Sequence, residues 1–400
     1  MKTKSQSEDT AASPGGEHVD PPRPLSAPVS MDLSITGRCN LSCRYCFYAD
    51  EMVSRDDLTT EEWKLAFEKL GEARVMRVVL TGGEVFTRPD LFQLIDSLIA
   101  NRMRYSILTN GTLIDEETAD SFMKGKRALR LDSVQVSVDG STAEVHDRSR
   151  PGSFHGAVRG LELLKDRGLP VTARVTVSKH NMDDLEGISR LLLDRLELPA
   201  FSICDASPIG TGCTFERELV LDHRDTLKAG LKMEELLERY PGRITASAGP
   251  LARLRAYRAM ETARRTGKLA DGWRMGCFSA CGGVFENAAV LHDGSVVPCS
   301  MLHDLRMGSI LTDDLLDLWR NSPVMNALRR RYRLPLSTVP ECSDCPWVEY
   351  CNGSCPGIVQ QMQGTFLRPD WRACYRDFLL ENGISSIFQA TGDEPGDAQR

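Results

Sequence analysis

The sequence has 400 residues, of which 41% are hydrophobic and 26% charged, with a formal net charge of −7. This length predicts two domains or slightly more, and the composition is that of a globular chain with a full hydrophobic core. The acidic balance argues against nucleic-acid binding. The lack of a long apolar run or signal-peptide core argues against membrane insertion and export.

The cysteine content and the two ends of the chain set further expectations. Thirteen cysteines in a chain without an export signal indicate metal chemistry in a reducing cytoplasm, rather than disulfides. Residues 1–28 contain five prolines and no aromatic residue, and residues 390–400 look similar. Such segments bury too little apolar surface to offset their ordering entropy, so both are expected to be disordered tails.

Between these tails, strand and helix patterns alternate. Thr59 and Glu62 form a capping box that opens a helix, and further helices are predicted at 90–101, 153–167 and 183–193. Strands are predicted at 31–36, 77–80, 105–109, 133–139, 171–178 and 201–204. Six strands alternating with helices predict a parallel sheet, either curled into a barrel or doubly wound.

The polarity of the strands favours the barrel. Val134, Val136 and Val138 alternate with polar residues, as do the valines of 171–178. Parallel strands that are covered on both faces have continuous apolar sequences. The alternation here therefore predicts that one face of the sheet is exposed to a polar, solvent-containing space. An incomplete barrel with a polar cavity fits best. The alternative, a half-exposed antiparallel sheet, is disfavoured because helical crossovers favour parallel pairing.

Three cysteines, Cys39, Cys43 and Cys46, follow the first strand with the spacing C-x3-C-x2-C. Three thiolates on one loop can hold three corners of a [4Fe–4S] cluster and leave the fourth iron to a small molecule. A zinc knuckle is the alternative. The run Gly82-Gly83-Glu84 follows the second strand, where it could also be a plain strand-to-helix turn.

A second field of cysteines occupies the C-terminal part. Cys281 and Cys299 flank an Asp-Gly hairpin turn, and Cys342, Cys345, Cys351, Cys355 and Cys374 follow. Four thiolates would equally suit structural zinc.

The loop, the Gly-Gly-Glu run and the strand pattern resemble the radical S-adenosylmethionine (SAM) superfamily. The resemblance implies an α/β fold, a partial (β/α)6 barrel, in which the loop cluster binds SAM. It places Gly82, Gly83 and Glu84 at the SAM amino group, and Ser137 and Asp139 at its ribose. Strand parity adds Arg174, which faces the cavity and could pair with the SAM carboxylate or form an ordinary surface ion pair.

The C-terminal spacing resembles the SPASM domain, whose best-known members carry two auxiliary [4Fe–4S] clusters. Carried over by position, Cys277, Cys281, Cys299 and Cys355 would hold one auxiliary cluster. Cys342, Cys345, Cys351 and Cys374 would hold the other. The implied organisation is a tail (1–28), a barrel (29–240), a SPASM domain (241–389) and a tail (390–400).

Cys204 and Cys213 remain outside these sets. Cys204 shares the cavity face of its strand with Ser202, where a thiol could donate a hydrogen atom, although a free cysteine is most often simply buried.

The resemblance implies an enzyme that cleaves SAM to a 5′-deoxyadenosyl radical and abstracts hydrogen from a peptide or protein. Oxidative cross-linking is the leading expectation, with a one-electron donor such as ferredoxin or flavodoxin. Residues 1–28 leave no room for a peptide-recognition domain, so a separate leader-peptide-binding protein or the barrel rim is expected to serve.

One departure from the family pattern disfavours formylglycine formation. Sulfatase-maturing enzymes place an aspartate base where this chain has Ser300, and serine is no such proton acceptor near neutral pH. A small-molecule cofactor maturase, for example one acting on a tetrapyrrole, and a non-catalytic iron–sulfur electron carrier stay open as alternatives.

Overall fold

A computed structural model describes residues 22–52, 56–267, 276–279 and 281–388 of the chain. These residues form one ten-stranded sheet in the order β10-β9-β8-β1-β2-β3-β4-β5-β6-β7. The strands are β1 (Ser30–Thr36), β2 (Arg77–Gly82), β3 (Arg104–Thr109), β4 (Leu131–Ser137), β5 (Val171–Val177), β6 (Phe201–Asp205), β7 (Ile244–Ala246), β8 (Asn287–Val290), β9 (Ser295–Val297) and β10 (Gly308–Ser309).

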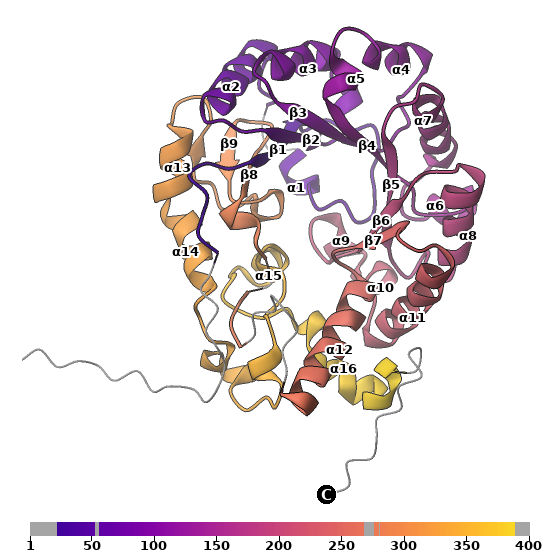
Figure 1. The fold of residues 1–400 in the computed structure, drawn as a ribbon, viewed down its shortest axis with the longest axis vertical. Helices are drawn as coiled ribbons and strands as arrows, with labels where there is room; N and C mark the ends of the chain where they lie inside the picture. The colour runs from indigo at the N-terminus through magenta and orange to yellow at the C-terminus, as the bar shows by residue number, and fades with distance from the viewer. Residues whose placement is uncertain (1–21, 53–55, 268–275, 280, 389–400) are drawn as a thin grey trace, which may run out of the picture.

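The first seven strands pair in parallel with their neighbours, and helices connect them. Figure 1 shows the sheet curving, with the helices on its outer side. The two ends of the sheet, β7 and β10, are not paired with each other. The predicted partial barrel of parallel strands is therefore confirmed, and the antiparallel alternative is wrong for this part of the sheet.

The helices follow the predicted order. They are α1 (Ala49–Met52), α2 (Thr60–Glu72), α3 (Leu91–Ala100), α4 (Glu116–Phe122), α5 (Arg127–Arg130), α6 (Ala143–His146), α7 (Phe154–Asp166), α8 (Leu185–Ser189), α9 (Thr211–Thr214), α10 (Glu216–Leu219), α11 (His223–Arg239), α12 (Pro250–Thr266), α13 (Leu315–Asn321), α14 (Pro323–Arg331), α15 (Pro356–Gln363) and α16 (Tyr375–Asn382). The capping box of Thr59 and Glu62 is formed at the start of α2.

The apolar strand residues pack against these helices. Val134, Val136 and Val138 are fully buried, whereas the alternating residues Gln135 and Ser137 keep partial exposure on the other face. The alternation seen in the sequence thus separates a dry outer face, covered by helices, from a polar inner face.

The hairpin β8–β9 joins the barrel sheet. β8 pairs in parallel with β1, and Asp32 lies opposite Ala289. Buried residues of β8 and β9, such as Val290 and Val296, belong to the same hydrophobic core as the barrel strands. The boundary expected at residues 240/241 therefore does not separate two sheets, because β7 and β8 extend the barrel sheet at its two edges. Pairing covers the backbone groups that an edge strand would expose.

Part of the expected N-terminal tail is held in place. The Leu25 N–H donates to the Phe285 carbonyl at 3.1 Å, and the indole of Trp319 donates to the Leu25 carbonyl at 2.8 Å. Residues 22–28 are thus tied to the C-terminal region, and residues 1–21 and 389–400 lie outside the described chain.

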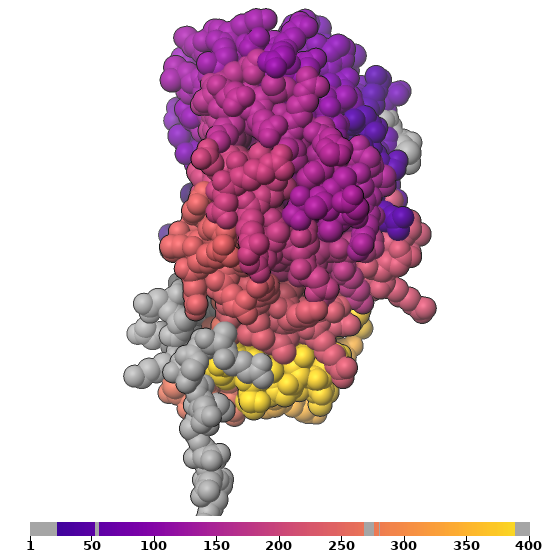
Figure 2. All heavy atoms as spheres, turned by 90° about the vertical axis from the view of Figure 1, so that its right-hand side faces the viewer, coloured from indigo at the N-terminus to yellow at the C-terminus, as the bar shows by residue number. Residues whose placement is uncertain are grey.

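The C-terminal residues pack on the helices that follow β6. Tyr257 of α12 stacks on Tyr375 of α16, with ring centroids 5.0 Å apart. Figure 2 shows the yellow C-terminal end of the described chain directly against this part of the molecule. No described helix is long and apolar enough to cross a membrane.

Leu33→Ala should reduce the free energy of unfolding by about 2–5 kcal/mol, because it empties a fully buried position in the central strand β1. The matched control Leu65→Ala removes a side chain that is 54% exposed on α2 and should change it by less than about 0.5 kcal/mol. Anaerobic denaturant titration measures both. Equal effects would contradict the placement of β1 at the centre of the core.

Candidate functional site

The loop with Cys39, Cys43 and Cys46 leaves the C-terminal end of β1 and is held by hydrogen bonds from distant parts of the chain. The Thr211 hydroxyl, in α9, donates to the Cys43 carbonyl at 2.9 Å and accepts from the Cys46 N–H at 2.8 Å. The Asp57 carboxylate accepts from the Gly37 N–H at 2.6 Å. The sequence predicts a loop over 205–214. It does not predict that Thr211 in this loop hydrogen-bonds to the backbone of the cysteine loop.

The three thiols receive N–H groups and are partly buried. The Leu41 N–H points to the Cys39 sulfur at 3.5 Å, and the Arg150 guanidinium points to the Cys43 sulfur at 3.7 Å. Burial raises the pKa of the Cys46 thiol to about 11. Free thiolates are therefore disfavoured, whereas metal coordination deprotonates a thiol outright. This donor set fits an iron–sulfur cluster, whose sulfurs accept hydrogen bonds.

Asp139 anchors this loop to the end of β4. Its carboxylate is 1% exposed and accepts from the Thr176 N–H at 2.7 Å and from Arg150 Nε at 2.6 Å. The Tyr45 hydroxyl also donates to it. Burial, more than the neighbouring charges, holds the pKa of Tyr45 well above its usual range.

These contacts change the assignment of Asp139. The sequence predicts that Asp139 contacts the SAM ribose, but both carboxylate oxygens are already engaged inside the protein. Asp139 is better described as a positioning residue for the loop. Ser137, which is partly exposed on the same strand, keeps the proposed ribose contact. Arg150 lies eleven residues beyond Asp139 with α6 between them, so no sequence spacing reveals the pair.

The Gly-Gly-Glu run packs directly on the start of the cysteine loop. Gly82 has φ of +126°, and a Cβ there would lie 2.3 Å from the Thr36 carbonyl oxygen. A Cβ on Gly83 would lie 2.0 Å from the Arg38 carbonyl oxygen. Only glycine allows this approach. The two glycines are therefore required by backbone contact between β2 and the loop.

Hydrogen bonds from residues at the end of β3 position Glu84. Its carboxylate accepts from the Thr109 hydroxyl and the Asn110 N–H, each at 2.7 Å. It is 1% exposed, and burial raises its pKa. Burial and, to a smaller extent, the charge of Glu84 raise the pKa of Cys39, which places Glu84 beside the loop. Both of its carboxylate oxygens are engaged inside the protein, as those of Asp139 are, so its contact with the SAM amino group stays a prediction.

Arg174 and Cys204 lie on the polar inner face of the sheet. Arg174 Nη1 donates to the Ser202 hydroxyl at 3.2 Å, and Gln135 Nε2 donates to the same hydroxyl at 3.3 Å. Arg174 makes no ion pair with any described residue, so its charge is available to a bound anion. The Cys204 sulfur lies 3.6 Å from the Thr176 hydroxyl, and burial raises the pKa of this thiol.

The C-terminal cysteines form two groups that are interleaved in sequence. Burial raises the pKa of Cys299 to about 12, and the neighbouring charges of Asp32, Cys281 and Cys355 raise it further. Cys355 thus lies with Cys281 and Cys299, although it follows Cys351 closely in sequence. This is the grouping that the resemblance implies.

The second group contains Cys342, Cys345 and Cys351. Burial raises the pKa of Cys342 to about 11, and charges at the other two raise it further. Cys374 lies near this group, since Cys374 and Cys351 both act on Tyr257. Cys277 pairs by its backbone with Pro335.

Arg331 supplies a buried cation beside the first group. It is 1% exposed and has no ion-pair partner among the described residues. Its guanidinium donates to backbone carbonyls, including that of Phe366 at 2.6 Å. Desolvation lowers its pKa to about 10, and the charges of Cys355 and Cys281 counteract this. An anionic thiolate-bound cluster would compensate the charge.

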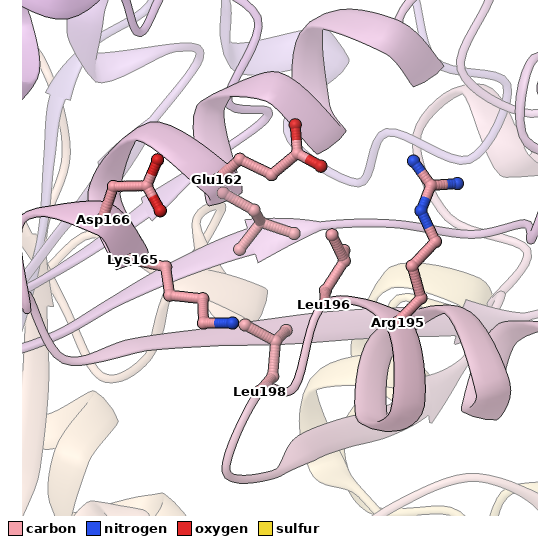
Figure 3. A pocket seen from close by; sticks show the side chains of 7 residues that line it. Glu162, Lys165, Asp166, Arg195, Leu196 and Leu198 are labelled. Carbon is pink, nitrogen blue, oxygen red and sulfur yellow. The ribbon is translucent and has the colours of Figure 1, made fainter.

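A hollow of about 140 Å³ opens elsewhere, on the outer layer of helices. Residues of α7 and of the π-helix Arg190–Arg195 line it, among them Glu162, Lys165 and Arg195 (Figure 3). The cysteine loops belong to the inner side of the sheet, so this hollow is not the site. The described residues contain no three His, Cys, Asp or Glu side chains spaced to hold one metal ion.

Comparison with known families identifies the two parts of the chain in which most of these cysteines lie. The radical SAM superfamily model matches residues 33–192. The model of SPASM, an iron–sulfur cluster-binding domain, matches residues 281–346. The chain is a radical SAM protein with a SPASM domain.

This radical SAM protein has relatives along most of its length. An AdoMet-dependent heme synthase of Methanosarcina barkeri is 26% identical over 88% of this chain and 97% of its own. The mycofactocin maturase MftC of Mycobacterium ulcerans is 28% identical over 83% of this chain and 84% of its own. The structure of Streptococcus suis SuiB bound to the precursor peptide SuiA matches with a TM-score of 0.65 at 15% identity, covering 88% of this chain and 76% of SuiB, which shows a shared fold.

Together, the family models and the donor sets show that the protein uses SAM and [4Fe–4S] clusters. Cys39, Cys43 and Cys46 would hold the SAM-binding cluster, and the two C-terminal groups would hold auxiliary clusters. We expect about 12 iron atoms per chain after anaerobic reconstitution, and loss of about four in the triple alanine variant of the loop cysteines. Stoichiometric zinc in anaerobically purified protein would contradict this.

Arg150→Gln should lower the reduction potential of the loop cluster, because it removes a positive charge next to Cys43 and so disfavours the more negative reduced state. Redox titration followed by electron paramagnetic resonance measures this. The control Arg148→Gln removes an exposed arginine two residues away and should leave the potential unchanged. The same potential in both variants would show that Arg150 does not act on the cluster.

Proposed function

We propose that the protein is a peptide-modifying enzyme that forms an oxidative cross-link in its substrate. The observation that carries this is the polar inner face beside the cysteine loop, where Arg174, Gln135 and Ser202 form a hydrogen-bonded lining. When bound, the cluster and SAM supply a radical that removes a hydrogen atom from the substrate. An electron carrier or sensor would need neither this lining nor the Gly-Gly-Glu packing.

A peptide substrate is favoured by the relatives. The matched relatives include a mycofactocin maturase and a PqqA peptide cyclase, and SuiB shares the fold and has been seen with its precursor peptide. Heme synthases are also among the relatives, which keeps a tetrapyrrole-acting enzyme as the second candidate.

The same proposal includes an electron donor, a cellular compartment and a means of binding the peptide. A one-electron donor such as ferredoxin or flavodoxin would reduce the loop cluster in the cytoplasm. None of the thirteen cysteines forms a disulfide in the structure. A leader peptide would be bound by a separate protein or by the barrel rim.

The test is an anaerobic reaction of the reconstituted protein with SAM, dithionite and synthetic peptides encoded beside its gene. Mass spectrometry should show 5′-deoxyadenosine and a peptide that has lost two hydrogen atoms. The triple alanine variant of Cys39, Cys43 and Cys46 should produce neither. Turnover of an iron porphyrin with no change in any peptide would favour the second candidate instead.

Cys204→Ser should leave product formation largely intact, because two auxiliary clusters provide an exit for the electron and a cross-link needs no hydrogen donor. Cys213→Ser, at the exposed cysteine, is the matched control. A stalled reaction in Cys204→Ser alone, or a product of unchanged mass, would instead indicate that the Cys204 thiol quenches a substrate radical and inverts a stereocentre.

A further inference from the structure

Asp32 occupies the inner face of the central strand β1. Its neighbours Met31 and Leu33 are fully buried on the outer face, so Asp32 points to the cavity side. In the register of the sheet it lies between Val79 of β2 and Ala289 of β8. Neither neighbouring side chain offers a hydrogen-bond donor. A carboxylate at this place therefore has no role in holding the sheet together.

The contacts of Asp32 leave one oxygen available. The Ser300 hydroxyl, directly after Cys299, donates to Asp32 Oδ2 at 3.4 Å. Oδ1 has no hydrogen-bond partner among the described residues, and it is not one of their buried unpartnered atoms. Oδ1 is therefore not fully buried.

Asp32 also differs from Asp139 and Asp205, two other carboxylates of the sheet. Asp139 is paired with Arg150, and Asp205 with Arg253. Asp32 forms no ion pair with any lysine, arginine or histidine in the described chain. Burial raises its pKa, against the lowering effect of Ser300. A carboxylate that faces a cavity without a cation is suited to accept a proton.

We propose that Asp32 is the catalytic base that takes the proton released when the cross-link closes, an assignment that rests on the proposed function. In that step a substrate carbon has already lost a hydrogen atom to the 5′-deoxyadenosyl radical. Bond formation between this carbon and an X–H group, such as a thiol or amine, breaks the X–H bond. It releases one proton and one electron. The proton would go to Asp32, and an oxidised iron–sulfur cluster, for which Cys299 is a proposed ligand, would accept the electron.

The position of Asp32 supports the proposal that it takes the proton while a cluster takes the electron. Ser300 links the carboxylate to the residue next to Cys299, and the charge of Asp32 already contributes to the raised pKa of Cys299. Proton and electron would thus leave the substrate on the same side of the cavity. Serine at position 300 then does not remove the base, because the carboxylate comes from β1.

Asp32→Asn tests the assignment with a near-isosteric change. The probes are the synthetic peptides encoded beside the gene, made from deuterated amino acids. Product formation should fall about 100-fold or more, whereas deuterium transfer into 5′-deoxyadenosine should stay within about threefold, since hydrogen abstraction precedes the proton transfer. The double variant D32N/S300D, which returns a carboxylate beside the same position, should recover product.

Two further measurements test whether the effect of D32N comes from the carboxylate. Loss of the negative charge in D32N should raise the potential of an auxiliary cluster, which redox titration detects without substrate. Asp96→Asn, at an exposed carboxylate on α3 paired with Arg127, should change neither product nor potential. Iron content checks folding, and Asp32→Ser serves as the second variant should D32N lose iron.

The outcomes separate the two proposals. Wild-type rates in D32N, or an effect confined to KM, would overturn the role of Asp32 as base while leaving the proposed function in place. An effect on KM alone would indicate that Asp32 binds a cationic group of the substrate. No deuterium transfer from any peptide to 5′-deoxyadenosine in the wild-type protein would overturn the proposed function and the Asp32 assignment with it.

Discussion

The parallel pairing of β8 with β1 is the constraint on which the site depends. β1 ends in the loop with the SAM-cluster cysteines, and β8 leads through β9 to Cys299. One ladder of backbone hydrogen bonds thus fixes two cysteine regions that are more than 200 residues apart in sequence. Because β8 and β9 share the hydrophobic core of the barrel, the packing of the barrel also holds this arrangement.

Buried charge is treated in two different ways around this ladder. Next to the cysteines, the protein provides arginines: Arg150 donates to the Cys43 sulfur, and Arg331 lies near Cys281 and Cys355. Burying an arginine without compensation is costly. Arg331, which has no ion-pair partner among the described residues, therefore fits a site that carries negative charge when a cluster is bound, whereas Arg150 is already paired with Asp139. The Arg150–Asp139 pair also connects the loop to β4 and so ties the cluster position to the barrel.

On the inner face of the sheet, charged residues of both signs lack an ion-pair partner within the described chain. Arg174 and Asp32 both lie there without an ion-pair partner among the described residues, one on β5 and one on β1. Unpaired charges in a partly buried site cost stability, and such residues concentrate where ligands bind or react. A sheet face with a cation on one strand and a carboxylate on another can orient a polar chain, as a peptide-modifying enzyme requires.

Much of this protein follows from local sequence patterns. The spacing of Cys39, Cys43 and Cys46, the Gly-Gly-Glu run and the alternating valines are all short-range features, and they determined the barrel, the cluster loop and the family. The roles of Asp139 and Asp32 were decided only by the tertiary structure. The first became an internal anchor because Arg150 and Tyr45 fold onto it, and the second became a candidate base because β8 brings Ser300 to β1. Hydrogen bonds between residues far apart in the chain produce no periodic pattern in the sequence. Each of them depends on how whole strands pair, and not on the residues next to it in the chain.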